Sequence, residues 1–139
     1  MNVLVDTSVW SLALRRKPAD LSRHESEVVA QLTYVIKEGR ARIVGPIRQE
    51  LLSGVKTEVQ FEALRKALEP FADEPIASDD YEDAARLYNA CRSHGLQAGP
   101  IDILICSMAL KRGWQVFSLD ANLIRCAGAL KLPVVDAVP

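Results

Sequence analysis

The sequence predicts an α/β protein with a central parallel sheet flanked by helices. Short apolar runs alternate along the chain with helical stretches, which is typical of strand-helix-strand units. The chain has 139 residues, 49% of them hydrophobic, which is enough for one domain with a sizeable core and too little for two. We therefore expect a single domain over residues 1–139.

The expected strands are short apolar runs, and the expected helices are bounded by capping residues, proline and glycine. Residues 2–5 lack polar alternation, as is typical of a strand buried on both faces. Helix starts favour Ser, Thr, Asp or Pro, and helix ends favour Gly. These signals predict strands at 2–5, 42–44, 115–119 and, at an edge, 132–136. They predict helices starting at Thr7 or Ser8, the capping box Ser22–Glu25, Pro46, Thr57, Ser78, Pro100 and residue 121.

Composition narrows the functional classes. Lys and Arg total 17 against 18 Asp and Glu, so no overall basic field attracts nucleic acid and any such contact needs a local patch. No run approaches the roughly 20 apolar residues of a membrane span, and no secretory signal is visible.

The spacing of Cys91, Cys106 and Cys126 fits buried thiols in a reducing compartment, so we expect a cytoplasmic protein. His24 and His94 are isolated, and a zinc site is not expected.

Two carboxylates follow expected strands directly. Asp6 comes after the first strand and Asp120 after the 115–119 strand, each just before a helix. In an open parallel sheet these strand ends share one edge, where ligands usually bind. Asp is also a preferred N-cap residue, so each carboxylate could simply cap its helix. Both interpretations remain open at this point.

Two more carboxylates lie beside apolar helix faces. Glu50 borders the face of Ile47 and Leu51, where its head could also reach water. Asp102 shares a face with Ile105 in a helix that is apolar nearly all round, although the helix dipole alone would favour an acid in the first turn. If the four acids converge, a hard cation such as Mg²⁺ or Mn²⁺ is the natural way to keep them ionised. A site of that kind suits phosphodiester hydrolysis.

Four sequence blocks resemble, in order and spacing, the acidic blocks of PIN-domain nucleases, and more narrowly those of VapC-type toxins from bacterial toxin-antitoxin pairs. They are VLVDTSVW at 3–10, GPIRQELLSG at 45–54, GPIDILICSMAL at 99–110 and VFSLDANL at 116–123. The resemblance implies a three-layer sandwich and an endoribonuclease that uses Mg²⁺ or Mn²⁺. It also implies that RNA is cleaved by metal-activated water, leaving 5'-phosphate and 3'-hydroxyl ends.

The same resemblance assigns roles to individual residues. It implies a catalytic quartet of Asp6, Glu50, Asp102 and Asp120, in which the three aspartates hold the ion and Glu50 orients or deprotonates the attacking water. Around the quartet it implies supporting roles for Thr7, Ser8, Ser118 and Asn122. Ser118 replaces a family-typical Thr and keeps its hydroxyl. Asn122 and Leu123 replace an Asp-Phe pair of many relatives, so a second ion would bind less firmly.

The resemblance and the charges together indicate the partners. The resemblance implies an RNA substrate, a cognate antitoxin and a homodimer, and it implies no membrane association. Arg48, Arg15 and Arg16 are the candidate RNA-binding cations, since an acidic cleft needs positive charge around it. The alternatives are a weak or inactive PIN scaffold that binds RNA or protein, and a metal-dependent nuclease that acts on DNA. A haloacid-dehalogenase phosphatase is disfavoured by Ser8, and a receiver-like module by the absence of an acid at the end of the second strand.

Overall fold

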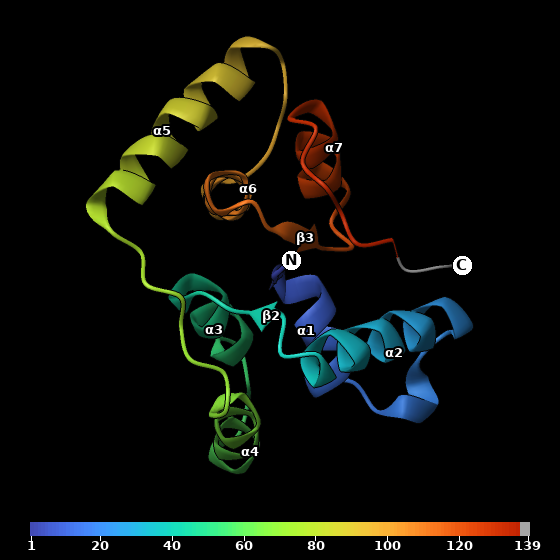
Figure 1. Cartoon of the computed structure of the whole chain (residues 1–139). Helices are drawn as coiled ribbons and strands as arrows, with labels where there is room; N and C mark the ends of the chain where they lie inside the picture. Colours follow the sequence, from blue (N-terminus) through green and yellow to red (C-terminus); the bar gives the residue numbers. More distant parts are fainter. Residues whose placement is uncertain (137–139) are drawn as a thin grey trace.

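The computed structural model describes residues 1–136 and contains three short parallel strands flanked by helices (Figure 1). The strands are β1 (Val3–Val5), β2 (Ala41–Arg42) and β3 (Gln115–Phe117), in the order β2-β1-β3. The central strand β1 has only apolar residues and is fully buried, as a strand covered on both faces must be. The predicted parallel α/β sheet is confirmed.

Single bridges extend the pairing beyond both outer strands. Ile43 bridges to Asp73, and Val116 bridges to Val134. The edge strand expected at 132–136 was therefore wrong in extent, since only this bridge forms there. Val116 N–H donates to the carbonyl of Pro133 at 3.0 Å, but Pro133 has no N–H with which to continue a ladder.

Most helix boundaries follow their sequence signals. Ser22 and Glu25 form the expected capping box, Thr57 accepts a hydrogen bond from the Gln60 N–H, and Gly113 ends its helix with φ of 70°. The helices in residues 1–136 are α1 (Thr7–Leu14), a 3₁₀ turn η1 (Pro18–Asp20), α2 (Arg23–Lys37), α3 (Gly45–Leu52), α4 (Glu58–Leu68), α5 (Ser78–Ser93), α6 (Pro100–Arg112) and α7 (Ala121–Ala129). Helix α1 begins at Thr7, but the expected capping residue was wrong, because Asp6 and neither Thr7 nor Ser8 occupies the N-cap position.

The helices divide into two groups around the sheet (Figure 1). The helices α5, α6 and α7 lie with β3 on one side of the picture, whereas α1 to α4 gather with β2 on the other. Helix α6 packs against β1 and β3 and is covered by α5, which is why seven of its residues, 103–109, are buried. Cys91, Cys106 and Cys126 are buried free thiols, as expected. Within residues 1–136, no helix is long and apolar enough to span a membrane.

Candidate active site

Asp6 is a buried carboxylate at the C-terminal end of β1. It is only 6% exposed, and its backbone N–H donates to the Phe117 carbonyl on β3 at 2.9 Å. Its side chain makes no capping hydrogen bond to α1, so the helix-cap interpretation of Asp6 was wrong. Instead Oδ2 accepts two hydrogen bonds, from the hydroxyls of Ser8 and Ser118, both at 2.8 Å. Oδ1 has no hydrogen-bond partner among residues 1–136 and is left for another ligand.

The two serines link Asp6 to the chain that follows β3. Ser118 Oγ also accepts from the Asp120 N–H at 3.0 Å, and Ser8 Oγ accepts from the Leu119 N–H at 2.9 Å. These bonds take the place of a strand ladder, which explains why β3 ends at Phe117 instead of residue 119. The buried hydroxyl of Thr7 finds no partner in the described part of the chain, so Ser8 and Ser118 are the hydroxyls that brace this carboxylate.

Asp120 both caps a helix and faces the site. It is the N-cap residue of α7, and its Oδ1 accepts from the Leu123 N–H at 2.9 Å, so for this residue the helix-cap interpretation is confirmed. The residue is exposed, which leaves its second oxygen accessible. Asn122, on the first turn of α7, accepts a hydrogen bond from Arg125 at 3.2 Å.

Asp102 shows that the four acids influence one another. It lies in the first turn of α6, half-buried, and its pKa is raised to about 6. Loss of solvent is the largest cause, and the negative charges of Asp120, Asp6 and Glu50 raise it further, while a backbone hydrogen bond from Gly99 lowers it. Glu50 is exposed on α3. The carboxylates predicted from distant parts of the sequence therefore form one electrostatically coupled group, which we call the acidic quartet.

A divalent cation fits the donor set of the acidic quartet. Four carboxylates without a cation partner leave excess negative charge at the sheet edge, and hard oxygen donors are the ligands that Mg²⁺ and Mn²⁺ prefer. Among residues 1–136, however, no three His, Cys, Asp or Glu side chains are placed to ligate one ion together. That spacing suits an ion that keeps several bound waters and is coordinated directly by only one or two carboxylates, as is usual for Mg²⁺.

The expected RNA-binding arginines are positioned differently from one another. Arg48 donates to Asp73 at 2.8 Å and to the carbonyls of Leu68 and Phe71, so its guanidinium holds the 68–73 segment against α3 and is not free for RNA. Arg16 donates to the Asp20 carbonyl at 3.0 Å and pairs loosely with Glu25. Arg15 is exposed at the C-terminal end of α1 and makes no ion pair within residues 1–136.

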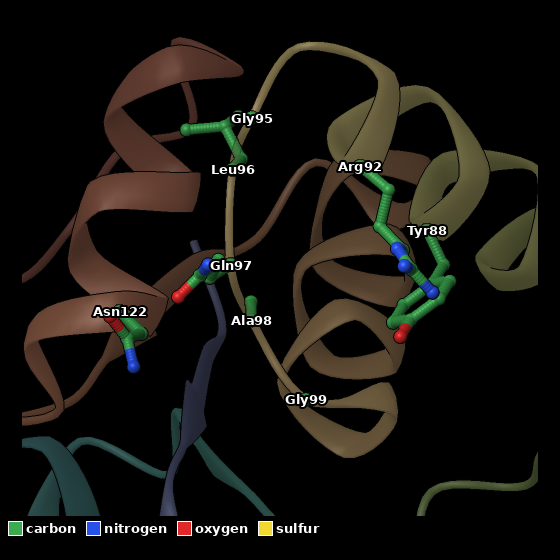
Figure 2. Close-up of a pocket in the computed structure, with 8 residues that line it drawn as sticks. All are labelled: Tyr88, Arg92, Gly95, Leu96, Gln97, Ala98, Gly99 and Asn122. Carbon is green, nitrogen blue, oxygen red and sulfur yellow. The ribbon is translucent and has the colours of Figure 1, made fainter.

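The structure also places a hollow beside the acidic quartet that the sequence did not reveal. Its polar lining comes from the end of α5 and from the segment before α6, namely Tyr88, Arg92 and Gln97, together with Asn122 of α7 (Figure 2). The only signal in the sequence was the pair of glycines, Gly95 and Gly99, that bounds an irregular segment between two predicted helices.

Comparison with known proteins identifies the family of this chain. The family model described as PIN domain matches residues 3–129. The chain belongs to the PIN domain family. PIN domains are generally nucleases. A search of the curated proteins found no match.

Among solved structures, the fold of this PIN domain is similar to that in FitAcB from Neisseria gonorrhoeae, with a TM-score of 0.76, 23% identity and 97% of each chain covered. It is also similar to VapBC-1 from nontypeable Haemophilus influenzae, with a TM-score of 0.72, 14% identity and coverage of 99% and 98%. VapBC2 from Rickettsia felis, bound to a DNA fragment from its promoter, gives a TM-score of 0.68 at 17% identity, with coverage of 97% and 98%. At these identities the likeness establishes the fold.

Proposed function

We propose that this PIN domain is a divalent-metal-dependent endoribonuclease and the toxin of a type II toxin-antitoxin pair. The observation that carries the enzymatic part is the placement of four acids from separate parts of the chain near one edge of the sheet, where the charges of Asp120, Asp6 and Glu50 all act on Asp102. Acids that repel one another at a sheet edge are stable as ions only when a cation joins them. Capping alone does not explain their convergence, because the Asp6 side chain makes no capping hydrogen bond to α1.

The toxin assignment rests on the solved structures. Their names, FitAcB and VapBC, describe complexes, and the matched chains are covered over 97–98% of their length in FitAcB and in the VapBC structures from Rickettsia felis and Haemophilus influenzae. We therefore infer that the partners of this chain are RNA, a cognate antitoxin and a second copy of itself, and that it acts in the cytoplasm.

The roles within the acidic quartet follow from burial and hydrogen bonding. Asp6, Asp102 and Asp120 would hold the ion, directly or through its bound waters, with Asp6 presenting Oδ1 because Ser8 and Ser118 occupy its other oxygen. A bound Mg²⁺ or Mn²⁺ supplies charge neutralisation at the phosphate and lowers the pKa of an attacking water. Glu50 is exposed and unpaired by any salt bridge within residues 1–136, so it is suited to orient that water and accept its proton.

The test is incubation of the purified protein, freed of any partner, with tRNA, rRNA and matched single-stranded DNA. We expect endonucleolytic cleavage of RNA with Mg²⁺ or Mn²⁺, and none in EDTA. Undiminished cleavage in EDTA would contradict the metal-dependent mechanism. Cleavage of DNA alone would establish a DNA nuclease, and absence of cleavage with either ion would favour the inactive scaffold that only binds.

A further inference from the structure

A hollow of about 590 Å³ lies between the end of α5 and the start of α7 (Figure 2). It is lined by Tyr88, Arg92, Gly95, Leu96, Gln97, Ala98, Gly99 and Asn122. Its volume is within the range of about 300–1,000 Å³ that is usual for sites of small organic ligands. No acidic residue is in this lining, in contrast to the acidic quartet next to it.

The hollow shares two walls with the acidic quartet. Gly99 is the N-cap residue of α6, and a Cβ at this glycine would lie 3.8 Å from Asp102 Oδ2. On the opposite side, Asn122 follows Asp120 by two residues on the first turn of α7. A chain with a phosphate at the acidic quartet would therefore carry its neighbouring nucleotide into the hollow.

Arg92 is the cation of this hollow, and its charge is available. Its guanidinium carbon lies 5.8 Å from the centroid of the half-buried Tyr88 ring, a cation-π contact that positions the planar group without neutralising it. Within residues 1–136 Arg92 has no carboxylate partner, whereas Arg48 and Arg112 are both paired with acids. Figure 2 shows the Arg92 side chain lying along Tyr88.

Two side-chain amides line the part of the hollow next to α7. Gln97 is exposed on the segment before α6, and its side chain points toward the start of α7, where Asn122 lies (Figure 2). The Gln97 amide makes no hydrogen bond within the described residues. Side-chain amides offer a donor and an acceptor in one plane, which matches the edges of nucleobases.

We infer that this hollow is the subsite for the nucleotide next to the scissile phosphate of single-stranded RNA, an inference that rests on the proposed nuclease function. The Arg92 guanidinium over Tyr88 forms a positively charged platform for a base, and the amides of Gln97 and Asn122 read the base edge. Unpaired bases in RNA are commonly held in this way, by stacking on aromatic rings or guanidinium planes and by hydrogen bonds to their edges. Gln97 is then a residue that determines cleavage sequence.

The platform is tested by equilibrium binding of fluorescent single-stranded RNA in EDTA, where cleavage is not expected. We expect Arg92→Ala to weaken binding about tenfold, in the range for loss of one base-stacking contact on a single strand. Arg86→Ala is the matched control, because it removes an exposed arginine from the same helix outside the hollow. It should change binding far less.

Base reading is tested by mapping cleavage ends on an RNA library randomised around one site. We expect Gln97→Ala to reduce the preference for one base beside the cut by about tenfold while other positions are unchanged. Gln60→Ala, on α4 and outside the hollow, should leave the preference as it is.

The outcomes separate this inference from the proposed function. Cleavage by the native protein, with binding and cut preference unaltered in both Arg92→Ala and Gln97→Ala, overturns the subsite and leaves the nuclease. Binding that depends on Arg92 without any cleavage supports a nucleotide-binding site in the hollow and overturns the nuclease. Native protein that neither binds nor cleaves RNA, or that binds matched single-stranded DNA more tightly, overturns the RNA subsite.

Discussion

Two acidic clusters lie near opposite ends of α6, and they differ in whether cations balance them. At the N-terminal end is the acidic quartet, where burial and the other three carboxylates raise the pKa of Asp102 to about 6. Near the C-terminal end, Lys111 and Arg112 bind a second cluster, which we call the neutralised cluster. It consists of Glu74, Asp79, Asp80 and Asp83.

The neutralised cluster shows what a structural group of acids is like in this protein. Asp80 is 4% exposed, and hydrogen bonds from Arg112 and from the Ala77 N–H, with the charges of its cationic neighbours, hold its pKa well below the ordinary range. Lys111 contacts Asp79 at 2.8 Å and Asp83 at 3.3 Å. Among residues 1–136 no Lys or Arg pairs with the acidic quartet, and this difference marks it as the place where an ion from outside is needed.

The largest effect is expected from removing one charge of the acidic quartet. Asp102→Asn should lower metal-dependent RNA cleavage by at least about a hundredfold, because one ligand charge is lost while the side-chain volume is kept. Cleavage rates under single-turnover conditions measure this. Asp83→Asn, a matched change in the neutralised cluster, should leave the rate within about twofold, as expected for a surface change. Full activity in Asp102→Asn would contradict the assignment.

A substitution that breaks the neutralised cluster should lower the stability of the protein and not the rate of RNA cleavage. Arg112→Ala leaves the buried Asp80 with only Lys111, 3.4 Å away, so we expect the free energy of unfolding to fall by about 2–3 kcal/mol. Urea denaturation measures the change. Arg65→Ala breaks an exposed pair with Glu62 and should cost less than about 1 kcal/mol. Equal losses in the two variants would show that burial of Asp80 is not what makes its ion pair important.

A smaller effect is expected from the hydroxyl that braces Asp6. Ser118→Ala removes one of two hydrogen bonds to Oδ2 and the acceptor for the Asp120 N–H. We expect the Mg²⁺ concentration for half-maximal cleavage to rise about tenfold, as for loss of an outer partner of a metal ligand. Ser93→Ala, an exposed serine at the end of α5, is the control. An unchanged Mg²⁺ requirement in Ser118→Ala would exclude a bracing role.

The contributions of Asp102 and Asp80 to the stability of the protein should change with pH in opposite directions. In metal-free protein, folded Asp102 binds its proton more tightly than the unfolded chain does, since its pKa rises from 3.8 to about 6. Its contribution to stability therefore grows as the pH falls from about 7 toward 4, and it is lost as the pH rises through 6. The contribution of Asp80, whose pKa is lowered, is full above about pH 4 and is lost below it.

Urea midpoints between pH 4.5 and 7.5 isolate the Asp102 contribution. Native protein should gain stability relative to Asp102→Asn as the pH falls, because only the native side chain takes up the extra proton. The relative stability of native protein and Asp83→Asn should be nearly constant over the same range. Parallel curves for native protein and Asp102→Asn would show that the pKa of Asp102 is not raised in the folded protein.

The sequence predicted the fold where local signals were strong. An apolar run at 3–5, the Ser22–Glu25 capping box and the glycine after α6 each act within a few residues, and each was confirmed. The edge strand at 132–136 failed because pairing there depends on Pro133, which cannot donate, and on a distant partner, Val116.

The sequence indicated which residues belong to the site, but not which groups each of their side chains would contact. Strand-end placement suggested Asp6 and Asp120, but the sequence could not separate a cap from a ligand; in the structure the Asp120 side chain makes a capping hydrogen bond and the Asp6 side chain makes none. Arg48 was the favoured RNA contact, yet its guanidinium is occupied by residues 20 to 25 positions away. Arg92 was overlooked because its position over Tyr88 depends on the irregular segment before α6.

Binding of Mn²⁺ measured by isothermal titration calorimetry tests most directly whether the acidic quartet is a cation site. The native protein and Asp83→Asn should bind Mn²⁺ with similar affinity, and Asp102→Asn should bind it at least about tenfold more weakly, because one of the coupled charges is gone. Equal affinity in all three proteins, or no binding to the native protein, would contradict the proposal that the excess charge of the quartet holds a divalent ion.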